Sequence, residues 1–270
     1  MTSPWQDLDR PPLRAPALRA ALLVDGALWT DLRVVDQTGS TNADVAALAR
    51  SGGREGLVLV AEEQVAGRGR ADRSWRAPAR SGIAVSVLLR PPVPRETWGW
   101  LPLLAGLSVV GPVAPMSGLN LGLKWPNDVL VDGTRKLAGV LAEVVDDAVV
   151  LGIGLNVSLQ SDERPSETAT SLQLEASQVV DRDPVLRAIL RDLDKSYRSF
   201  VAAGGDAARS GLLDSYRAAS TTVGRAVLVT LPGGRTVEGA ATDIDAAGRL
   251  VVRTSTGVQT LAAGDVTHVR

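Results

Sequence analysis

The residues most able to do chemistry are crowded into one stretch, residues 64–80, which lies between two apolar runs of strand length. This stretch, the arginine loop, holds Gly67, Gly69 and five arginines: Arg68, Arg70, Arg73, Arg76 and Arg80. Glycines let the backbone bend sharply and let an anion come close to its N–H groups. Guanidinium groups give charged, forked donors that match carboxylate and phosphate oxygens. The arginine loop is therefore predicted to close on a polyanionic ligand.

Further polar residues lie where they could meet the same ligand. Ser40-Thr41-Asn42 stand between a strand pattern and a helical pattern, so their hydroxyl and N–H groups are expected at a strand-to-helix turn. Thr41 and Asp44 have the spacing of a capping box, with the acid in place of the usual glutamate. Plain helix capping is the alternative role for this triplet. Polar residues also interrupt apolar runs at 124–128, at 135–136 and at Asn156.

Composition excludes several classes of site. The chain has 270 residues and a net charge of −1, which argues against a basic nucleic-acid-binding face, so any phosphate affinity has to be local. It has no cysteine, which excludes disulfides, cysteine zinc ligands and thiol nucleophiles. Its one histidine, His268, is expected to be a packing or surface residue, because a catalytic triad or a histidine-rich metal site is hard to build with it.

The bulk properties are those of a folded globular protein. Hydrophobic residues make up 45% and charged residues 22% of the chain, with a mean hydropathy of +0.09. The first residues lack the regions of a signal peptide, and no run is expected to reach the ~18 apolar residues of a membrane span. A cytoplasmic location is therefore expected. Among the 29 basic residues only Lys124, Lys136 and Lys195 are lysines, which draws attention to each of them.

The elements that position these residues follow from hydrophobic periodicity and from turn residues. Strand patterns flank the arginine loop at 57–61 and 82–89, and a hydrophobic helix is expected over 96–110, ending before Pro112. Residues 121–131 predict a strand, a kink at the proline and a second strand, which lead into an antiparallel meander. The remaining patterns are a strand at 32–35, meander strands at 135–145 and 149–157, and helices at 17–23, 43–50, 183–200 and around 212–216.

From Val223 onward the pattern changes to five short strands with glycine-rich turns, which predicts a small β-barrel. The chain is therefore divided into an N-terminal extension at 1–30, a large domain at 31–220 and the barrel at 221–270. A winged-helix DNA-binding domain would need about twice the length of the extension. The large domain is expected to hold all the reactive residues.

Four motifs in a fixed order carry a resemblance to a known family: Gly67-Arg68-Gly69-Arg70, Lys124-Trp125-Pro126-Asn127-Asp128, Lys136-Leu137-Ala138-Gly139 and Gly154-Leu155-Asn156. With Ser40-Thr41-Asn42 ahead of them and the barrel behind them, the chain resembles the biotin protein ligases over roughly residues 33–270. The resemblance implies an α+β fold: a class II aminoacyl-tRNA-synthetase-like mixed β-sheet with helices, followed by a small SH3-like β-barrel. It also implies the short form of the family, without an N-terminal DNA-binding domain.

The implied reaction has two steps, with ATP and biotin as substrates and Mg²⁺ as helper. Biotin's carboxylate attacks the α-phosphate of ATP, which gives biotinyl-5′-AMP and pyrophosphate. A lysine of a biotin carboxyl carrier protein domain, part of a biotin-dependent carboxylase, then takes the biotin. Bringing a carboxylate onto a triphosphate requires fixed positive charge, for which Arg68, Arg70, Arg73 and Lys136 are the candidates. Neither DNA nor a membrane is an expected partner.

The resemblance also implies a role for each matched residue. The residues implied for biotin's ureido ring are Ser40, Thr41, Asn42 and Gln64, with the backbone around Gly67, Arg68 and Gly69. Those implied for the reacting groups are Arg70 and Lys136 at the carboxylate and α-phosphate, Arg73 at the phosphate, Trp75 over adenine, Asn127 and Asn156 at the adenylate or a metal, Asp128 at the acceptor lysine, and Lys124 in support of the ligand phosphates or of the loop.

Arg70, Lys136, Asp128 and Lys124 form the implied catalytic set, and no residue is assigned as a metal ligand. Trp125 is expected in the core. Asp72 stands where many relatives have glycine, and as an acid among arginines it is expected to temper adenylate binding or to pair with a neighbouring arginine.

Alternatives remain at this point. A lipoate or octanoate protein ligase shares the fold class, but such enzymes typically use a glycine-rich signature with a histidine, or a cysteine, and this chain offers neither in the right place. A biotin-sensing repressor would need a helix-turn-helix, for which the chain lacks length and charge. A non-catalytic binding module is disfavoured by the full set of motifs.

Overall fold

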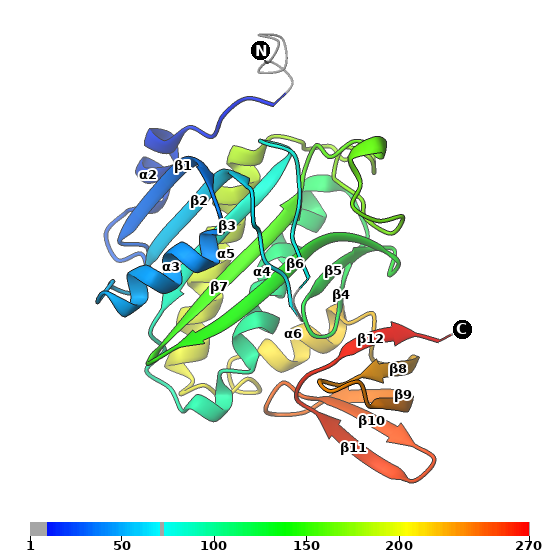
Figure 1. Ribbon diagram of the computed structural model, residues 1–270. Helices are drawn as coiled ribbons and strands as arrows, with labels where there is room; N and C mark the ends of the chain where they lie inside the picture. Colours follow the sequence, from blue (N-terminus) through cyan, green and yellow to red (C-terminus); the bar gives the residue numbers. More distant parts are fainter. Residues whose placement is uncertain (1–9, 71–72, 270) are drawn as a thin grey trace.

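The structure is a computed structural model that describes residues 10–70 and 73–269. In the described chain a mixed seven-stranded sheet has the strand order β1-β2-β3-β7-β6-β5-β4 (Figure 1). β1 and β2 pair in parallel and every other neighbouring pair is antiparallel. The strands are β1 (Asp31–Thr38), β2 (Leu57–Gln64), β3 (Gly82–Leu89), β4 (Leu121–Lys124), β5 (Asp128–Val131), β6 (Arg135–Val145) and β7 (Ala148–Asn156). The predicted α+β class with a mixed sheet is confirmed.

Both faces of this sheet are covered, because its central strands carry apolar side chains on alternate sides. In β2, Leu57 and Leu59 pack in a cluster under α3 (Thr41–Arg50), while Val58 and Val60 face the main core. α3 lies on the same side of the sheet as the arginine loop in Figure 1. The other helices are α2 (Ala15–Leu22), α4 (Trp100–Ser117), α5 (Arg182–Ala202) and α6 (Leu212–Ala219), with short 3₁₀ turns at Arg95–Thr97 and Ser161–Glu163.

The helix predicted over 96–110 is placed wrongly. α4 runs from Trp100 to Ser117, contains Pro112 and Pro115, and ends at Gly118 in the left-handed conformation with φ 74°. Each proline removes one backbone donor, but α4 is the central core helix and packs against α5 and the sheet, so tertiary packing outweighs the local cost.

The prediction that no apolar run reaches the length of a membrane span is also wrong. α4 has the length and composition of a membrane span, with a mean hydropathy of 1.4 over 18 residues. However, 61% of these residues are buried inside the fold, as is typical of a core helix.

The kink predicted at Pro126 is present. A cis peptide bond joins Trp125 to Pro126 between β4 and β5, and the antiparallel register sets Lys124 opposite Asp128. Trp125 is buried, as predicted, and its Nε1 donates to the carbonyl of Gly248 at 3.1 Å. The turn therefore holds its polar residues beside the C-terminal sheet.

The C-terminal strands form a separate antiparallel sheet with the order β11-β10-β9-β8-β12, in agreement with the predicted SH3-like domain. These strands are β8 (Ala226–Thr230), β9 (Thr236–Ile244), β10 (Leu250–Thr254), β11 (Gly257–Leu261) and β12 (Asp265–His268). Trp100 Nε1 donates to the carbonyl of Ala246 at 2.7 Å, so two indoles bind the β9–β10 turn to the large domain. We propose a domain boundary near residue 220, after α6.

Candidate active site

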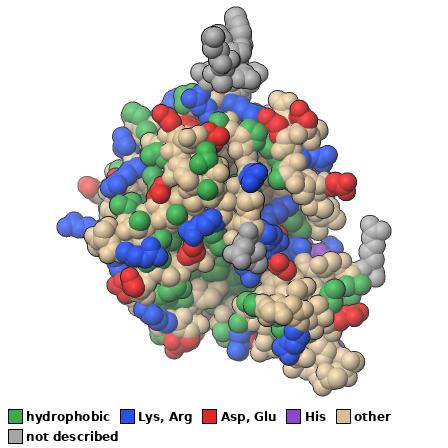
Figure 2. All heavy atoms as spheres, viewed as in Figure 1, with side chains coloured by type: hydrophobic (Ala, Val, Ile, Leu, Met, Phe, Trp, Pro, Cys, Tyr) green, Lys and Arg blue, Asp and Glu red, His purple; other side chains and the backbone are tan. Residues whose placement is uncertain are grey.

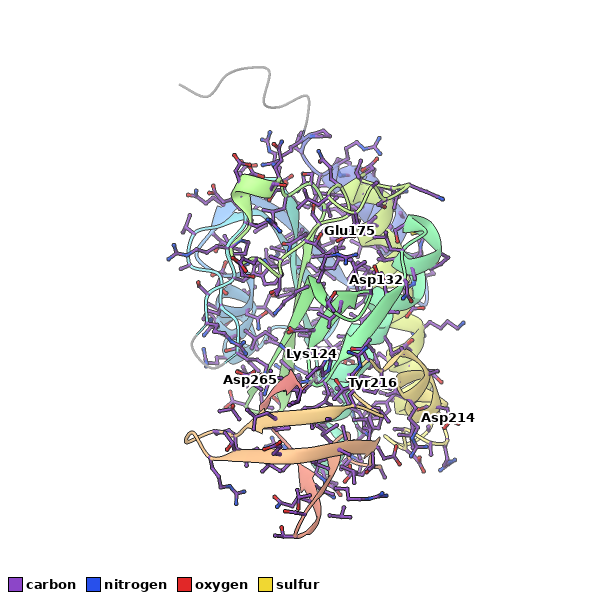
Figure 3. All side chains as sticks on the ribbon, turned by 90° about the vertical axis from the view of Figure 1, so that its right-hand side faces the viewer. Lys124, Asp132, Glu175, Asp214, Tyr216 and Asp265 are labelled. Atoms are coloured by element: carbon purple, nitrogen blue, oxygen red, sulfur yellow. The ribbon has the colours of Figure 1, made fainter. Side chains whose placement is uncertain are left out.

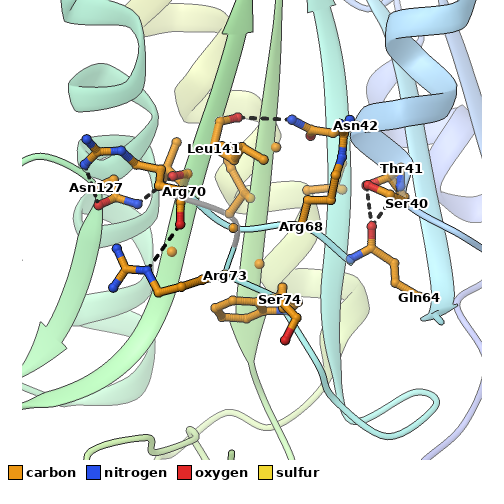
Figure 4. Close-up of a pocket in the computed structure, with 18 of the residues that line it drawn as sticks. Ser40, Thr41, Asn42, Gln64, Arg68, Arg70, Arg73, Ser74, Asn127 and Leu141 are labelled. Carbon is orange, nitrogen blue, oxygen red and sulfur yellow. Dashed lines mark hydrogen bonds between the residues drawn. The ribbon is translucent and has the colours of Figure 1, made fainter. Parts of the chain in front are cut away.

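A pocket opens between the start of α3, the arginine loop and strands β6 and β7 (Figure 4). Its polar and charged lining comes from four segments that are far apart in the sequence. The predicted site residues that line it are Ser40, Thr41, Asn42, Gln64, Arg68, Gly69, Arg70, Arg73, Trp75, Asn127 and Lys136. Ser74, Val85, Gly139, Val140, Leu141, Gly152, Ile153 and Gly154 complete it.

The polar end of the pocket is built at the start of α3. Ser40 is the N-cap, with extended φ and ψ, and Thr41 is the first helical residue. The predicted capping box is wrong, because the Thr41 hydroxyl and its N–H both face Gln64 Oε1, at 3.0 and 2.8 Å. The Asp44 carboxylate instead accepts from Thr38 Oγ1 at 2.5 Å. The start of α3 is therefore tied to the strand that leads into the arginine loop.

Hydrogen-bond donors are in short supply at this polar end. Ser86 Oγ lies 2.7 Å from Thr41 Oγ1 and 2.6 Å from Asn42 Oδ1, and Thr41 Oγ1 lies 3.0 Å from Gln64 Oε1. These three oxygen–oxygen contacts share only two hydroxyl protons. One acceptor is therefore left for a donor from outside, which favours a ligand head group with N–H or O–H groups.

Glycines on the floor of the pocket make room for the side chains above them. A Cβ atom at Gly152 would overlap the amide oxygen of Asn42, and one at Gly154 would overlap the Trp75 indole. At Gly139 a Cβ would stand 3.3 Å from the same indole. Asn42 and Trp75 thus rest directly on the backbone of β6 and β7.

The other end of the pocket is cationic. Lys136 Nζ forms an ion pair with Asp128 Oδ1 at 2.6 Å and stands 5.9 Å from the centre of the Trp75 ring. Arg70 Nη1 donates to Asn127 Oδ1 at 3.3 Å. Burial lowers the pKa of Arg70 from its ordinary value, although the nearby carboxylate of Asp265 opposes this, and the guanidinium stays charged. Two cations thus meet at one end of the pocket, whereas the side chains of Ser40, Thr41, Asn42 and Gln64 at its other end are uncharged.

The arginine loop is folded back on itself above the sheet. Arg68 and Ser74 form an antiparallel bridge, and Trp75 N–H donates to the Gly67 carbonyl at 2.8 Å. Gly67 lines a second pocket, which shares Arg68, Gly69, Arg70, Arg73, Ser74 and Leu141 with the first. Basic and acidic side chains are interspersed over the face that the loop crosses (Figure 2). The hairpin brings Arg68, Arg70 and Arg73 over one pocket.

Two ion pairs fasten the loop to other elements. Arg68 Nη2 lies 3.1 Å from Glu143 Oε2 in β6, and Arg73 Nη2 lies 2.6 Å from Asp265 Oδ1 in β12. Arg76 lines the second pocket, whereas Arg80 lines a separate cleft together with Arg182 and does not belong to this cluster. The loop is thus held by the large sheet on one side and by the C-terminal domain on the other.

Three predicted residues lie behind the pocket or away from it. Asp128 reaches the pocket through its ion pair with Lys136, and Lys124 stands opposite Asp128 in the β4–β5 ladder. Burial lowers the pKa of Lys124, while Asp128 acts in the opposite direction. Figure 3 shows Lys124 near Asp265 and Tyr216, where the two domains meet. Asn156 is buried and donates to the Thr170 carbonyl at 2.9 Å, outside the pocket, so its contact with a nucleotide remains a prediction.

Sequence reasoning missed Ser74, Ser86, Glu143 and Asp265. Glu143 and Ser86 sit inside ordinary strand patterns, and Asp265 belongs to the other domain, so no local signal marks them. Asp72, which was expected to pair with an arginine, lies outside the described residues. The positions of Glu143 and Asp265 beside the loop become apparent only in the tertiary structure, across the sheet and across the domain contact.

Comparisons with known proteins agree with this geometry. Residues 34–159 match the biotin/lipoate A/B protein ligase family, and residues 222–269 match the biotin protein ligase C terminal domain. The chain is 46% identical over 270 residues to the biotin–[acetyl-CoA-carboxylase] ligase of Mycobacterium tuberculosis, covering 98% of this chain and 99% of the relative. It is 36% identical to the bifunctional ligase/repressor BirA of Bacillus spizizenii, covering 86% of this chain and 72% of the relative.

Solved structures show the same fold. The biotin protein ligase from Aquifex aeolicus in complex with biotin and ATP aligns with a TM-score of 0.75 at 27% identity, covering 90% of this chain and 100% of that chain.

Proposed function

The chain belongs to the biotin protein ligase family, and on that premise we propose how its pocket carries out the ligase reaction. The matched regions, the relatives and the fold agree on one activity, the ATP-dependent attachment of biotin to protein. The observation that carries the proposal is a single pocket with a donor-poor polar end and a cationic end. A ureido ring brings N–H donors to the first end, and a carboxylate and phosphates bring anions to the second.

In the first step, biotin lies with its ring at Ser40–Asn42 and Gln64 and its carboxylate near Arg70 and Lys136. A carboxylate oxygen attacks the α-phosphorus of ATP, and the bond to the bridging oxygen breaks, so that pyrophosphate leaves with the bonding electrons. The two cations offset the repulsion between the anions as the transition state forms. Arg73 is proposed to meet the phosphate and Trp75 the adenine, which it can do because the indole lies over the glycine floor.

Mg²⁺ would enter with ATP and draw charge from the leaving pyrophosphate. Within residues 10–70 and 73–269 there is no cluster of three carboxylate, histidine or cysteine ligands. A cation held mainly by phosphate oxygens and water, with Asn127 nearby, fits this donor set.

In the second step, the amine of an acceptor lysine attacks the carbonyl carbon of biotinyl-5′-AMP. The amide bond forms, AMP leaves with the electrons of the broken C–O bond, and the amine loses a proton. We propose that Asp128 positions this lysine once Lys136 has turned to the ligand, and that Lys124 supports the phosphates. The acceptor is a carrier domain of a biotin-dependent carboxylase, and the reaction takes place in the cytoplasm without DNA or membrane.

The proposed function is tested by measuring the transfer of biotin to an acceptor protein. Purified protein, biotin, MgATP and a biotin carboxyl carrier protein domain should yield one biotinylated lysine, detected by mass spectrometry. Omitting ATP, or replacing the acceptor lysine by arginine, should abolish the product. Transfer of octanoate or lipoate without any transfer of biotin would overturn the proposal in favour of a lipoate-type ligase.

A further inference from the structure

Glu143, in β6, joins the two parts of the pocket that the reaction needs together. A single carboxylate oxygen, Oε2, accepts from Asn42 Nδ2 at 2.7 Å and from Arg68 Nη2 at 3.1 Å. Asn42 belongs to the polar end and Arg68 to the arginine loop. The side chain of Glu143 is 29% exposed, and it lines the second pocket together with Arg68.

The Glu143 carboxylate is the nearer of two acceptors that orient the Asn42 amide; the other is the Leu141 carbonyl, 3.4 Å from Nδ2. Both only accept hydrogen bonds, so they select the NH₂ end of the amide and turn Oδ1 toward Ser86 Oγ, 2.6 Å away. Asn42 cannot retreat, because its amide rests on the backbone of Gly152. The orientation of this amide produces the shortage of donors at the polar end, which a ligand N–H group can relieve.

The same hydrogen bonds run in a circuit back to the arginine loop. From Asn42 they pass through Ser86 and Thr41 to Gln64, which is the first residue of that loop. Arg68, four residues further on, closes the circuit through Glu143. Removing the charge of Glu143 therefore affects both the polar end of the pocket and the arginine loop.

We propose that Glu143 is a positioning residue that couples occupation of the polar end to the placement of the arginine loop through Arg68. The proposal rests on the proposed function, in which biotin fills the polar end. Glu143 touches neither the reacting carboxylate nor the phosphate. It sets the geometry of Asn42 and Arg68, which face the ligand.

The experiment uses the full chain and the variants Glu143→Gln, Arg68→Gln and the double variant. Biotin affinity is measured by calorimetry without ATP, and trypsin cleavage within the arginine loop is followed with and without biotin. Glu143→Gln should weaken biotin binding by about tenfold, because the hydrogen bonds from Asn42 and Arg68 both lose their charged acceptor, and biotin should protect the loop less. The double variant should lose less affinity than the sum of the two single losses, because both substitutions break the Arg68–Glu143 ion pair.

Glu63→Gln is the matched control, since the Glu63 carboxylate also accepts from a side-chain amide, Gln37 Nε2 at 2.8 Å, outside this pocket. It should bind biotin like the parent protein. Thermal melting is recorded for every variant, and Glu143→Asp replaces Glu143→Gln in the cycle if the latter does not fold. Parental biotin affinity in the Glu143 variant, or strictly additive losses, would overturn the coupling. A parent protein that binds no biotin would instead refute the proposed function.

Discussion

Lys136 occupies the point where the reacting anions are expected to meet. Its ammonium group is 2.6 Å from Asp128 and faces the Trp75 ring, at the cationic end of the pocket. Replacing Lys136 by alanine should slow adenylate formation by at least about a hundredfold, the usual loss when one transition-state donor is removed. Pyrophosphate release measures this rate.

The melting temperature of Lys136→Ala should change little, because the ammonium is partly exposed and its ion pair is near the surface. Lys195→Ala is the matched control, since Lys195 lies exposed on α5 and far from the pocket lining. A fall in activity that parallels a fall in melting temperature would mean that Lys136 is structural.

At the scale of the element, β7 supports two different side chains through two glycines. Gly152 makes room for Asn42 and Gly154 for Trp75. Gly152→Ala should therefore raise the KM for biotin about tenfold, and Gly154→Ala should raise the KM for ATP by a similar factor, from overpacking of roughly 1–3 kcal/mol. Steady-state kinetics with each substrate varied separately checks the division.

Each of the two variants serves as the control for the other, because both substitutions add one methyl group to the same strand, two residues apart. Equal effects of both variants on both substrates would show that β7 shifts as a whole, and the proposed separation of the two subsites would then be wrong.

At the scale of the whole molecule, the C-terminal domain contributes a carboxylate to the arginine loop. Asp265 pairs with Arg73 at 2.6 Å, and the Gly264 carbonyl lies 3.4 Å from Arg70 Nη1. Asp265→Asn should raise trypsin cleavage within the loop about two- to fivefold, the range expected for one exposed ion pair. Asp243→Asn removes another carboxylate of the C-terminal domain, one that pairs with Arg217 of α6 and not with the arginine loop, and it should leave loop cleavage unchanged.

The domain contact also predicts a dependence of stability on pH. Burial lowers the pKa of His268 from 6.5 to about 4, and the positive charges of Lys124 and Arg225 act in the same direction. The folded state therefore favours the neutral ring, so its contribution is complete above pH 6.5 and is lost as the pH falls toward 4. His268 Nε2 is 3.3 Å from Thr222 Oγ1, which in turn accepts from Trp125 N–H.

Between pH 7.5 and pH 5 the melting temperature should accordingly fall more for the parent protein than for His268→Gln, whose glutamine does not titrate in this range. The same fall in both proteins would assign the loss of stability to other groups.

Much of the fold and many of the pocket residues follow from local sequence. Apolar runs of strand length on both sides of the arginine loop predict β2 and β3, and glycine-rich turns after Val223 predict the C-terminal strands. The ordered motifs and the resemblance that they carry predict the polar and charged residues of the pocket lining apart from Ser74. The strands depend on side-chain periodicity and turn chemistry, which act over a few residues, whereas most of the pocket residues are implied by the family resemblance.

The tertiary structure decided the rest. α4 continues through Pro112 because the surrounding core stabilises it. The Thr41 hydroxyl donates a hydrogen bond to Gln64 because α3 starts beside the end of β2. Glu143 and Asp265 reach the loop only across the sheet and across the domain contact. Local sequence sets which residues can form a helix, a strand or an anion-binding loop. Which of them come into contact depends on burial and on pairing between distant segments. These interaction energies arise only when the segments pack together, so the sequence of one segment does not reveal them.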